Sequence, residues 1–173
     1  MDRLSTLLVH FGIGADTFHS GPLLDALEGT QAHQRGRVYL LKEGRACLEM
    51  PAGVQRVAEP SLILIPRALP HRLVATKADR AEVVAASLRF DGGLDNPLSV
   101  ALTDSISMPL KDIPMIAGTL DWLFSEAFAE HCGREAVMNR LFELMVIQFL
   151  RHMMAYHSMT TGMMSGLADL RLA

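Results

Sequence analysis

The 173-residue sequence is poor in cysteine, in aromatic residues and in surplus positive charge. Its two cysteines, Cys47 and Cys132, show no CxxC or Cys/His spacing, so neither a disulfide framework nor a structural zinc site is indicated. With 16 Lys and Arg against 19 Asp and Glu, the net charge of −3 lacks the basic surplus that binding to nucleic-acid phosphates requires. This chain itself is therefore not predicted to bind DNA or RNA.

Long apolar runs and the common catalytic motifs are also missing. The longest runs span four to five residues, at 62–65 and 144–147, against the ~20 that a membrane helix requires. The N-terminus has no small-residue cleavage site for export. No G-x-S-x-G elbow, P-loop, dinucleotide-binding glycine pattern or HExxH motif occurs. These absences predict a soluble, cytoplasmic protein with no membrane partner.

Half of the residues are hydrophobic, which suits a single domain with a buried core. Leu4 begins an i, i+3, i+4, i+7 series of apolar residues, and Gly12 follows at a position where a helix commonly ends. We therefore expect a short N-terminal helix within residues 1–15.

From residue 16 to residue 95, short apolar or alternating runs are separated by glycine and proline. Several short strands with a spacing of about 8 to 12 residues are typical of an antiparallel barrel or sandwich. The best candidates are Arg37–Leu41, Ala46–Met50, Leu62–Ile65, His71–Ala75 and Glu82–Phe90. We expect a β-barrel over residues 16–95, followed by a linking segment over 96–111.

A helical hairpin is expected over residues 112–158. Asp112 is a candidate N-cap with Pro114 in the first turn, and Gly133 is expected to end the first helix. The second helix is predicted over Arg134–Tyr156, where apolar residues cover far more than one stripe.

A helix this apolar must be covered on two sides. One interpretation is that it forms the interface of a homodimer, and the other is that it lies between the barrel and the preceding helix of the same chain. The candidate interface residues are Leu141, Leu144, Met145, Gln148, Phe149 and Met153.

Proline, glycine and histidine residues in the strand region have the spacing of a known pair of motifs. Pro66, Ala68 and His71 have the spacing of the second cupin motif, and His33 and Gly44 match two positions of the first. The run Leu62-Ile-Leu-Ile-Pro-Arg67 is similar to the segment that precedes the motif histidine in cupins. The resemblance implies a cupin-like antiparallel β-barrel of the jelly-roll type, in a mainly β plus α fold.

The helical region extends the resemblance to the N-terminal cupin domain of AraC/XylS-type transcriptional regulators. Between Arg140 and Arg151, the residues follow the pattern RL-EL---Q-LR of that family. The resemblance implies an effector-sensing and dimerisation domain that forms a homodimer. It also implies that DNA is bound only by a helix-turn-helix domain absent from this chain, to which residues 159–173 would lead.

Four residues are candidates for a ligand site. If Arg37 points into the barrel, strand alternation brings Tyr39 to the same face, and His33 and His71 would join them at the cavity mouth. A guanidinium, a phenol and two imidazoles would suit a small anionic or aromatic effector. The alternative is that Arg37 lies on a solvated face, as most arginines do.

No cofactor is expected. Metal-dependent cupins hold a divalent ion with three histidines and a carboxylate, and this chain retains only His33 and His71 as weak candidates. Arg37 stands at the carboxylate position, where its charge would repel a cation. Two alternatives stay open: a small metal-dependent cupin enzyme of the dioxygenase or isomerase type, and a scaffold that dimerises without a ligand.

Overall fold

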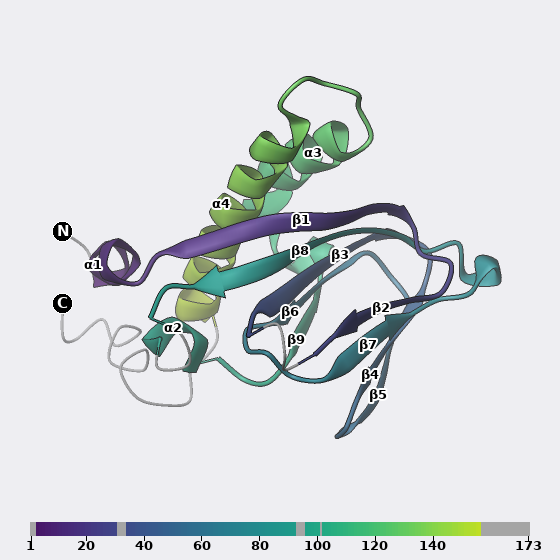
Figure 1. Ribbon diagram of the computed structural model, residues 1–173, viewed down its shortest axis with the longest axis horizontal. Coiled ribbons are helices and arrows are strands. Elements are labelled where there is room, and N and C mark those ends of the chain that lie inside the picture. Colours follow the sequence, from purple (N-terminus) through teal and green to yellow (C-terminus); the bar gives the residue numbers. More distant parts are fainter. Residues whose placement is uncertain (1–2, 31–33, 93–95, 101, 157–173) are drawn as a thin grey trace.

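The computed structural model describes residues 3–30, 34–92, 96–100 and 102–156 (Figure 1). Its helices are α1 Arg3–His10, α2 Pro97–Val100, α3 Ala117–Ala127 and α4 Arg134–Tyr156. Its strands are β1 Ile13–Pro22, β2 Ala26–Gly29, β3 Gly36–Glu43, β4 Ala46–Met50, β5 Gly53–Val57, β6 Ser61–Ile65, β7 His71–Val74, β8 Glu82–Phe90 and β9 Ile106–Pro109.

Within these residues the strands form two antiparallel sheets that face each other. The larger has the order β1-β8-β3-β6-β9 and the smaller the order β2-β7-β4-β5. Figure 1 shows α4 lying across the outer face of the larger sheet, with α3 beside it. The expected arrangement, an antiparallel barrel of mainly β structure with a short N-terminal helix and a C-terminal helical hairpin, is confirmed.

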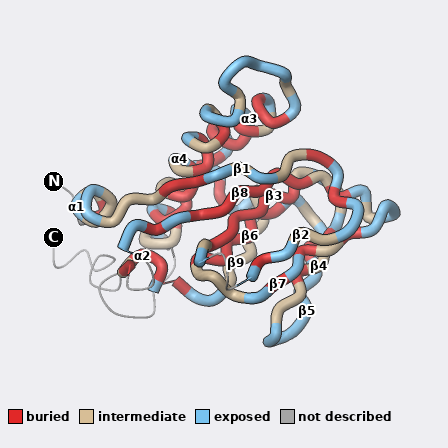
Figure 2. The backbone as a smooth tube through the Cα atoms, in the orientation of Figure 1, coloured by how far each residue is buried: buried red, intermediate tan, exposed pale blue. Residues whose placement is uncertain are grey.

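The larger sheet is buried on both faces because alternate side chains serve two different cores. Val38 and Leu40 point outward into the cluster that the helices cover. Tyr39 and Leu41 point inward, into the cluster between the two sheets. Figure 2 shows the resulting concentration of buried residues in β3, β6 and β8. A strand buried on both faces reads as a continuous apolar run, as Leu62–Ile65 does.

The α4 helix is covered within the chain on most of its surface. Leu141, Met145 and Phe149 are buried in the helix-facing core, and the Thr119 hydroxyl donates to Gln148 Oε1 across the α3–α4 contact at 2.8 Å. These three apolar residues were expected at a subunit interface, and that expectation is corrected: the sheet and α3 already bury them. Leu144 is 45% exposed and stays available to a partner.

Two expected boundaries differ from the structure. β1 begins at Ile13, inside the segment predicted as helix, because β8 supplies a partner strand for it along its whole length. β9, at Ile106–Pro109, lies inside the expected linking segment but pairs with β6 and belongs to the larger sheet. The barrel therefore extends beyond residue 95.

The first helix of the hairpin also differs. Asp112 is not an N-cap: two short 3-10 turns cover Leu110–Asp112 and Pro114–Ile116, and α3 begins only at Ala117. Because a proline disfavours helical backbone in the residue before it, Ile113 takes φ −125° and ψ 62° and interrupts the helix. The second helix is observed over Arg134–Tyr156, as expected. The expected linker at 159–173 lies outside the described residues.

Candidate functional site

Three of the four candidate ligand-site residues lie together at one end of the barrel interior. Arg37 and Tyr39 come from β3, and His71 is the first residue of β7 in the opposite sheet. All three are buried, with exposed fractions of 9%, 0% and 5%. The interpretation that Arg37 lies on a solvated face is therefore wrong. His33 lies outside the described residues.

Tyr39 and His71 form a buried hydrogen-bonded pair whose proton positions follow from their partners. The Nδ1 of His71 is 2.6 Å from the carbonyl oxygen of Leu69, which can only accept, so Nδ1 carries the hydrogen. The Nε2 then accepts from the hydroxyl of Tyr39 at 2.7 Å.

The pKa shifts of this pair agree with two neutral side chains. Burial lowers the pKa of His71, the bond to the Leu69 carbonyl opposes that shift, and the positive charge of Arg37 reinforces it. Burial raises the pKa of Tyr39, while the charge of Arg37 and a hydrogen bond from it act in the opposite direction. Near neutral pH, Arg37 is therefore the charged member of the cluster.

Gly29 makes room for the imidazole. It pairs with His71 across the β2–β7 ladder, and a Cβ atom at this position would overlap the ring of His71. A side chain at Gly29 would therefore displace the histidine and break its bond to Tyr39.

Arg37 is the unusual member of the site. Several exposed arginines around the barrel have acidic partners: Arg35 is 2.6 Å from Asp16, and Arg72 bonds Glu28 and Glu49. Arg37 has no carboxylate within ion-pair distance among the residues that the structure describes, and its buried Nε has no hydrogen-bond partner. Burying an unpaired charge costs several kcal/mol in general. The site thus holds a positive charge with an unused donor.

Phe18 covers this guanidinium and was missed by the sequence analysis. The Cζ of Arg37 lies 4.7 Å from the centre of the Phe18 ring, a cation–π distance. The same ring stands nearly perpendicular to Tyr39, with 6.4 Å between ring centres. Phe18 sits at a β-bulge, where Thr17 pairs with Ala86 and the next paired residue is His19. A bulge changes the alternation, so no period-2 pattern could place Phe18 at the site.

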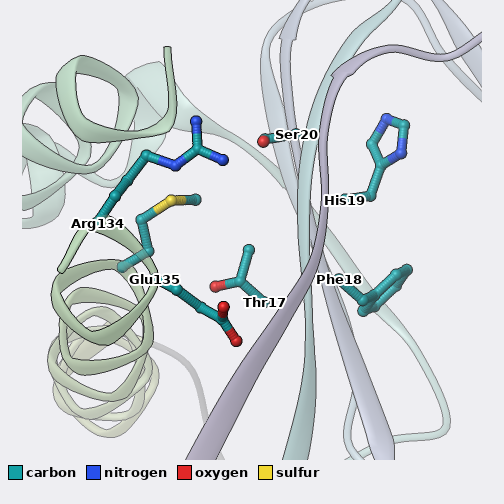
Figure 3. Close-up of a pocket in the computed structure, with 7 residues that line it drawn as sticks. Thr17, Phe18, His19, Ser20, Arg134 and Glu135 are labelled. Carbon is teal, nitrogen blue, oxygen red and sulfur yellow. The ribbon is translucent and has the colours of Figure 1, made fainter. Parts of the chain in front are cut away.

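A hollow lies on the α4 side of β1, between the bulge and the start of α4. Its volume is about 220 Å3, and it is lined by residues 17–20 of β1 and by Arg134, Glu135 and Met138 of α4. In Figure 3, Thr17 and Ser20 lie on the α4 side of the strand, whereas Phe18 and His19 lie on the opposite side. The bulge therefore borders both the barrel site and this cleft.

The donor set of the barrel site does not suit a divalent cation. Both ring nitrogens of His71 have hydrogen-bond partners, and the guanidinium of Arg37 would repel a metal ion. In the described part of the chain, no three His, Cys, Asp or Glu side chains gather in a metal-binding group. Because His33 is not described, the expectation of no bound metal stays a prediction.

Both helices of the hairpin have large apolar residues that are exposed. Trp122 on α3 is 59% exposed and Leu144 on α4 is 45% exposed, with Met115 just before α3. Of the other expected interface residues, Gln148 bonds Thr119 and Met153 packs against the helix-facing core. Trp122 was not among the expected interface residues, which all lie on the second helix. Among the described helices, none is long and apolar enough to cross a membrane.

The chain belongs to the cupin family, whose sequence profile matches residues 2–155. No curated protein sequence matches it. Among solved structures, an apo form of a ToxT variant from Vibrio cholerae is 12% identical with a TM-score of 0.44, and the match covers 90% of this chain and 61% of that one. The AraC-like transcriptional activator CuxR is 15% identical with a TM-score of 0.44, covering 79% of this chain and 55% of that one.

Wild-type ToxT with a bound unsaturated fatty acid is similar at 13% identity and a TM-score of 0.42, with 90% of this chain and 60% of that chain covered. This chain thus spans less than two thirds of the length of each of these proteins.

Proposed function

We propose that this cupin domain is the effector-sensing and dimerisation part of a transcription regulator, and that its effector is a small carboxylate bound at Arg37. The observation that carries the proposal is the buried guanidinium inside the barrel, which has no carboxylate partner among the described residues and whose Nε donor is unused. The AraC/XylS-like pattern between Arg140 and Arg151 supports the regulator class. DNA binding would belong to a further domain.

A carboxylate fits the site for two reasons. A guanidinium presents its N–H groups in one plane, and a carboxylate can accept two of them side by side. Phe18 lies over the face of the guanidinium, so its ring does not use the N–H edge. The aromatic rings of Phe18 and Tyr39 would contact the apolar part of the ligand. The site therefore favours a carboxylate that carries an aromatic or aliphatic group.

Thermal unfolding tests the ligand class with matched pairs of probes. We expect sodium benzoate and sodium octanoate to stabilise the protein, because a ligand at a hundredfold its Kd adds about 2.7 kcal/mol. Benzamide and octanamide should not, since they lack the negative charge. The stabilisation should disappear in the Arg37→Gln variant. It should persist in the Arg72→Gln control, which removes an arginine that already has acidic partners. Equal responses to carboxylates and amides would rule out the ionic role of Arg37.

Dimerisation is the second part of the proposal and rests on the exposed apolar side chains of the hairpin. Trp122 and Leu144 are large side chains that the chain leaves exposed, and large exposed apolar patches mark interaction sites. We expect light scattering to give a dimer mass at micromolar concentration, and Leu144→Lys to give a monomer that unfolds at an unchanged temperature. Val54→Lys, a similarly exposed position on β5, is the control that should stay dimeric.

A further inference from the structure

We propose that Phe18 is a lid on the Arg37 site and that the β1 bulge passes the displacement of this lid to α4 through Thr17 and Asn139. The inference rests on the proposed function, since it concerns how occupancy of the same site is reported. Its evidence is separate: the contacts on the two sides of β1.

The first step is that a ligand must move Phe18. The Nε of Arg37 is buried, and Arg37 as a whole residue is 9% exposed. Phe18, whose ring lies over the guanidinium, is 43% exposed, so Phe18 lies between the charge and the solvent. A carboxylate that reaches the N–H edge of Arg37 therefore takes space that the ring now borders.

The second step is that Phe18 can move without breaking the sheet. β1 and β8 pair on both sides of the bulge, at Thr17 and at His19, and Phe18 is the extra residue between them. An extra residue in a bulge is not held by the strand ladder. Its displacement costs the cation–π contact with Arg37 and the edge contact with Tyr39, both of which a bound carboxylate with an aromatic or aliphatic group replaces.

The third step is that the neighbouring residue is attached to α4. The backbone N–H and the hydroxyl of Thr17 both donate to Asn139 Oδ1, each at 2.8 Å. Two residues earlier, the N–H of Ala15 donates to Glu143 Oε1 at 3.3 Å, and Glu143 in turn accepts from Arg140. Because Thr17 and Phe18 share a peptide bond, a shift of the bulge changes the bonds to Asn139.

The fourth step is that there is room for such a shift. The cleft of about 220 Å3 lies directly between the bulge and the first turn of α4. Figure 3 shows Thr17 facing this cleft, with Arg134 and Glu135 approaching from the helix. Tightly packed side chains would resist the movement of the strand, whereas this hollow does not.

Nuclear magnetic resonance of the whole chain tests the relay through the backbone amides of Arg140 and Glu143 on α4. Sodium benzoate and sodium octanoate, each added separately at a saturating concentration, should shift these resonances in the wild type. Phe18→Leu, which removes the ring, should shift them in the same direction without a ligand. Phe18→Tyr keeps the ring and should leave them at their wild-type positions.

Two variants at Asn139 isolate the connection. Asn139→Ala removes the acceptor, so the carboxylates should bind with a Kd within about twofold of wild type while the α4 shifts fall to less than half. Asn139→Asp keeps an acceptor oxygen and should restore them. An exposed control, Val54→Leu on β5, should change neither quantity.

The outcomes separate the relay from the proposed function. If the carboxylates bind and the α4 resonances stay in place, or if Phe18→Leu leaves those resonances unchanged, the relay is wrong and the carboxylate site stands. If neither carboxylate binds, the proposed function fails, and the Phe18→Leu spectrum still decides whether the bulge and α4 are connected.

Discussion

The two faces of the larger sheet differ in what they bury. Against the helices, β3 presents Val38 and Leu40 to a cluster made of apolar side chains. Toward the barrel interior, the same strand presents Arg37 and Tyr39, and β8 presents Ser87 opposite Arg37. The outer face is therefore part of an apolar core, whereas one end of the inner face contains polar groups that folding alone does not require.

Within β3, the outward side chains therefore contribute to stability, whereas the inward Arg37 belongs to the proposed ligand site. Apolar side chains on the outer face gain free energy from leaving water, at about 25 cal/mol for each Å2 buried. On the inner face, the guanidinium of Arg37 loses its hydration and receives no carboxylate in return from the described residues. We conclude that substitution of a buried apolar residue on the outer face and substitution of Arg37 on the inner face should have opposite effects on stability.

The largest effect is expected on the helix-facing side. Phe149, a residue of α4, is fully buried in the helix-facing core. Deletion of a buried phenylalanine ring costs about 3–5 kcal/mol. We expect Phe149→Ala to lower the free energy of unfolding by this amount in urea denaturation. Leu144→Ala on the exposed side of the same helix is the control and should change it by less than about 0.5 kcal/mol.

The second prediction concerns Arg37 and would break the comparison if it failed. Replacing a buried charge with an apolar side chain of similar length is generally neutral or stabilising, by about 1–4 kcal/mol. We expect Arg37→Met to keep or raise the free energy of unfolding and to abolish carboxylate binding in calorimetry. A variant that is clearly less stable than wild type would mean that the contacts of the guanidinium with Phe18 and Tyr39 outweigh the cost of burying its charge.

The third prediction is a smaller, pH-dependent effect at His71. Burial lowers the pKa of this imidazole from its ordinary value of 6.5, so the unfolded chain takes up a proton at a higher pH than the folded chain does. The contribution of His71 to the free energy of unfolding is therefore fully present above pH 6.5, and it decreases as the pH falls from there toward the lowered pKa. Urea denaturation should show a steeper loss of stability below pH 6.5 for wild type than for His71→Gln, which cannot titrate.

Much of the fold could be predicted from the sequence because the strands are bounded by glycine and proline. The limits of Ala46–Met50 and Glu82–Phe90 agree with the structure to the residue. The alternation of β3 also correctly placed Arg37 and Tyr39 on one face. β1, β2, β5 and β9 were not identified. The last three have only four or five residues each, and the alternation of β1 is interrupted by its bulge.

The rest of the site depends on contacts that no local pattern reveals. Phe18 reaches Arg37 only because of a bulge, and the position of Thr17 beside Asn139 joins residues 122 positions apart in the sequence. The expected interface illustrates the opposite problem. The apolar surface of α4 was real, but the sheet and α3 cover Leu141, Met145 and Phe149 within one chain.

The pairing of β9 with β6 has a consequence for how the chain folds during synthesis. β6 is a fully buried strand, and its outer edge is closed only by Ile106–Pro109. A nascent chain that has not yet emerged past residue 109 therefore exposes one side of an apolar strand, which is a template for pairing with other chains. Folding from the N-terminus thus has a vulnerable interval, and fragments that end before Ile106 should aggregate.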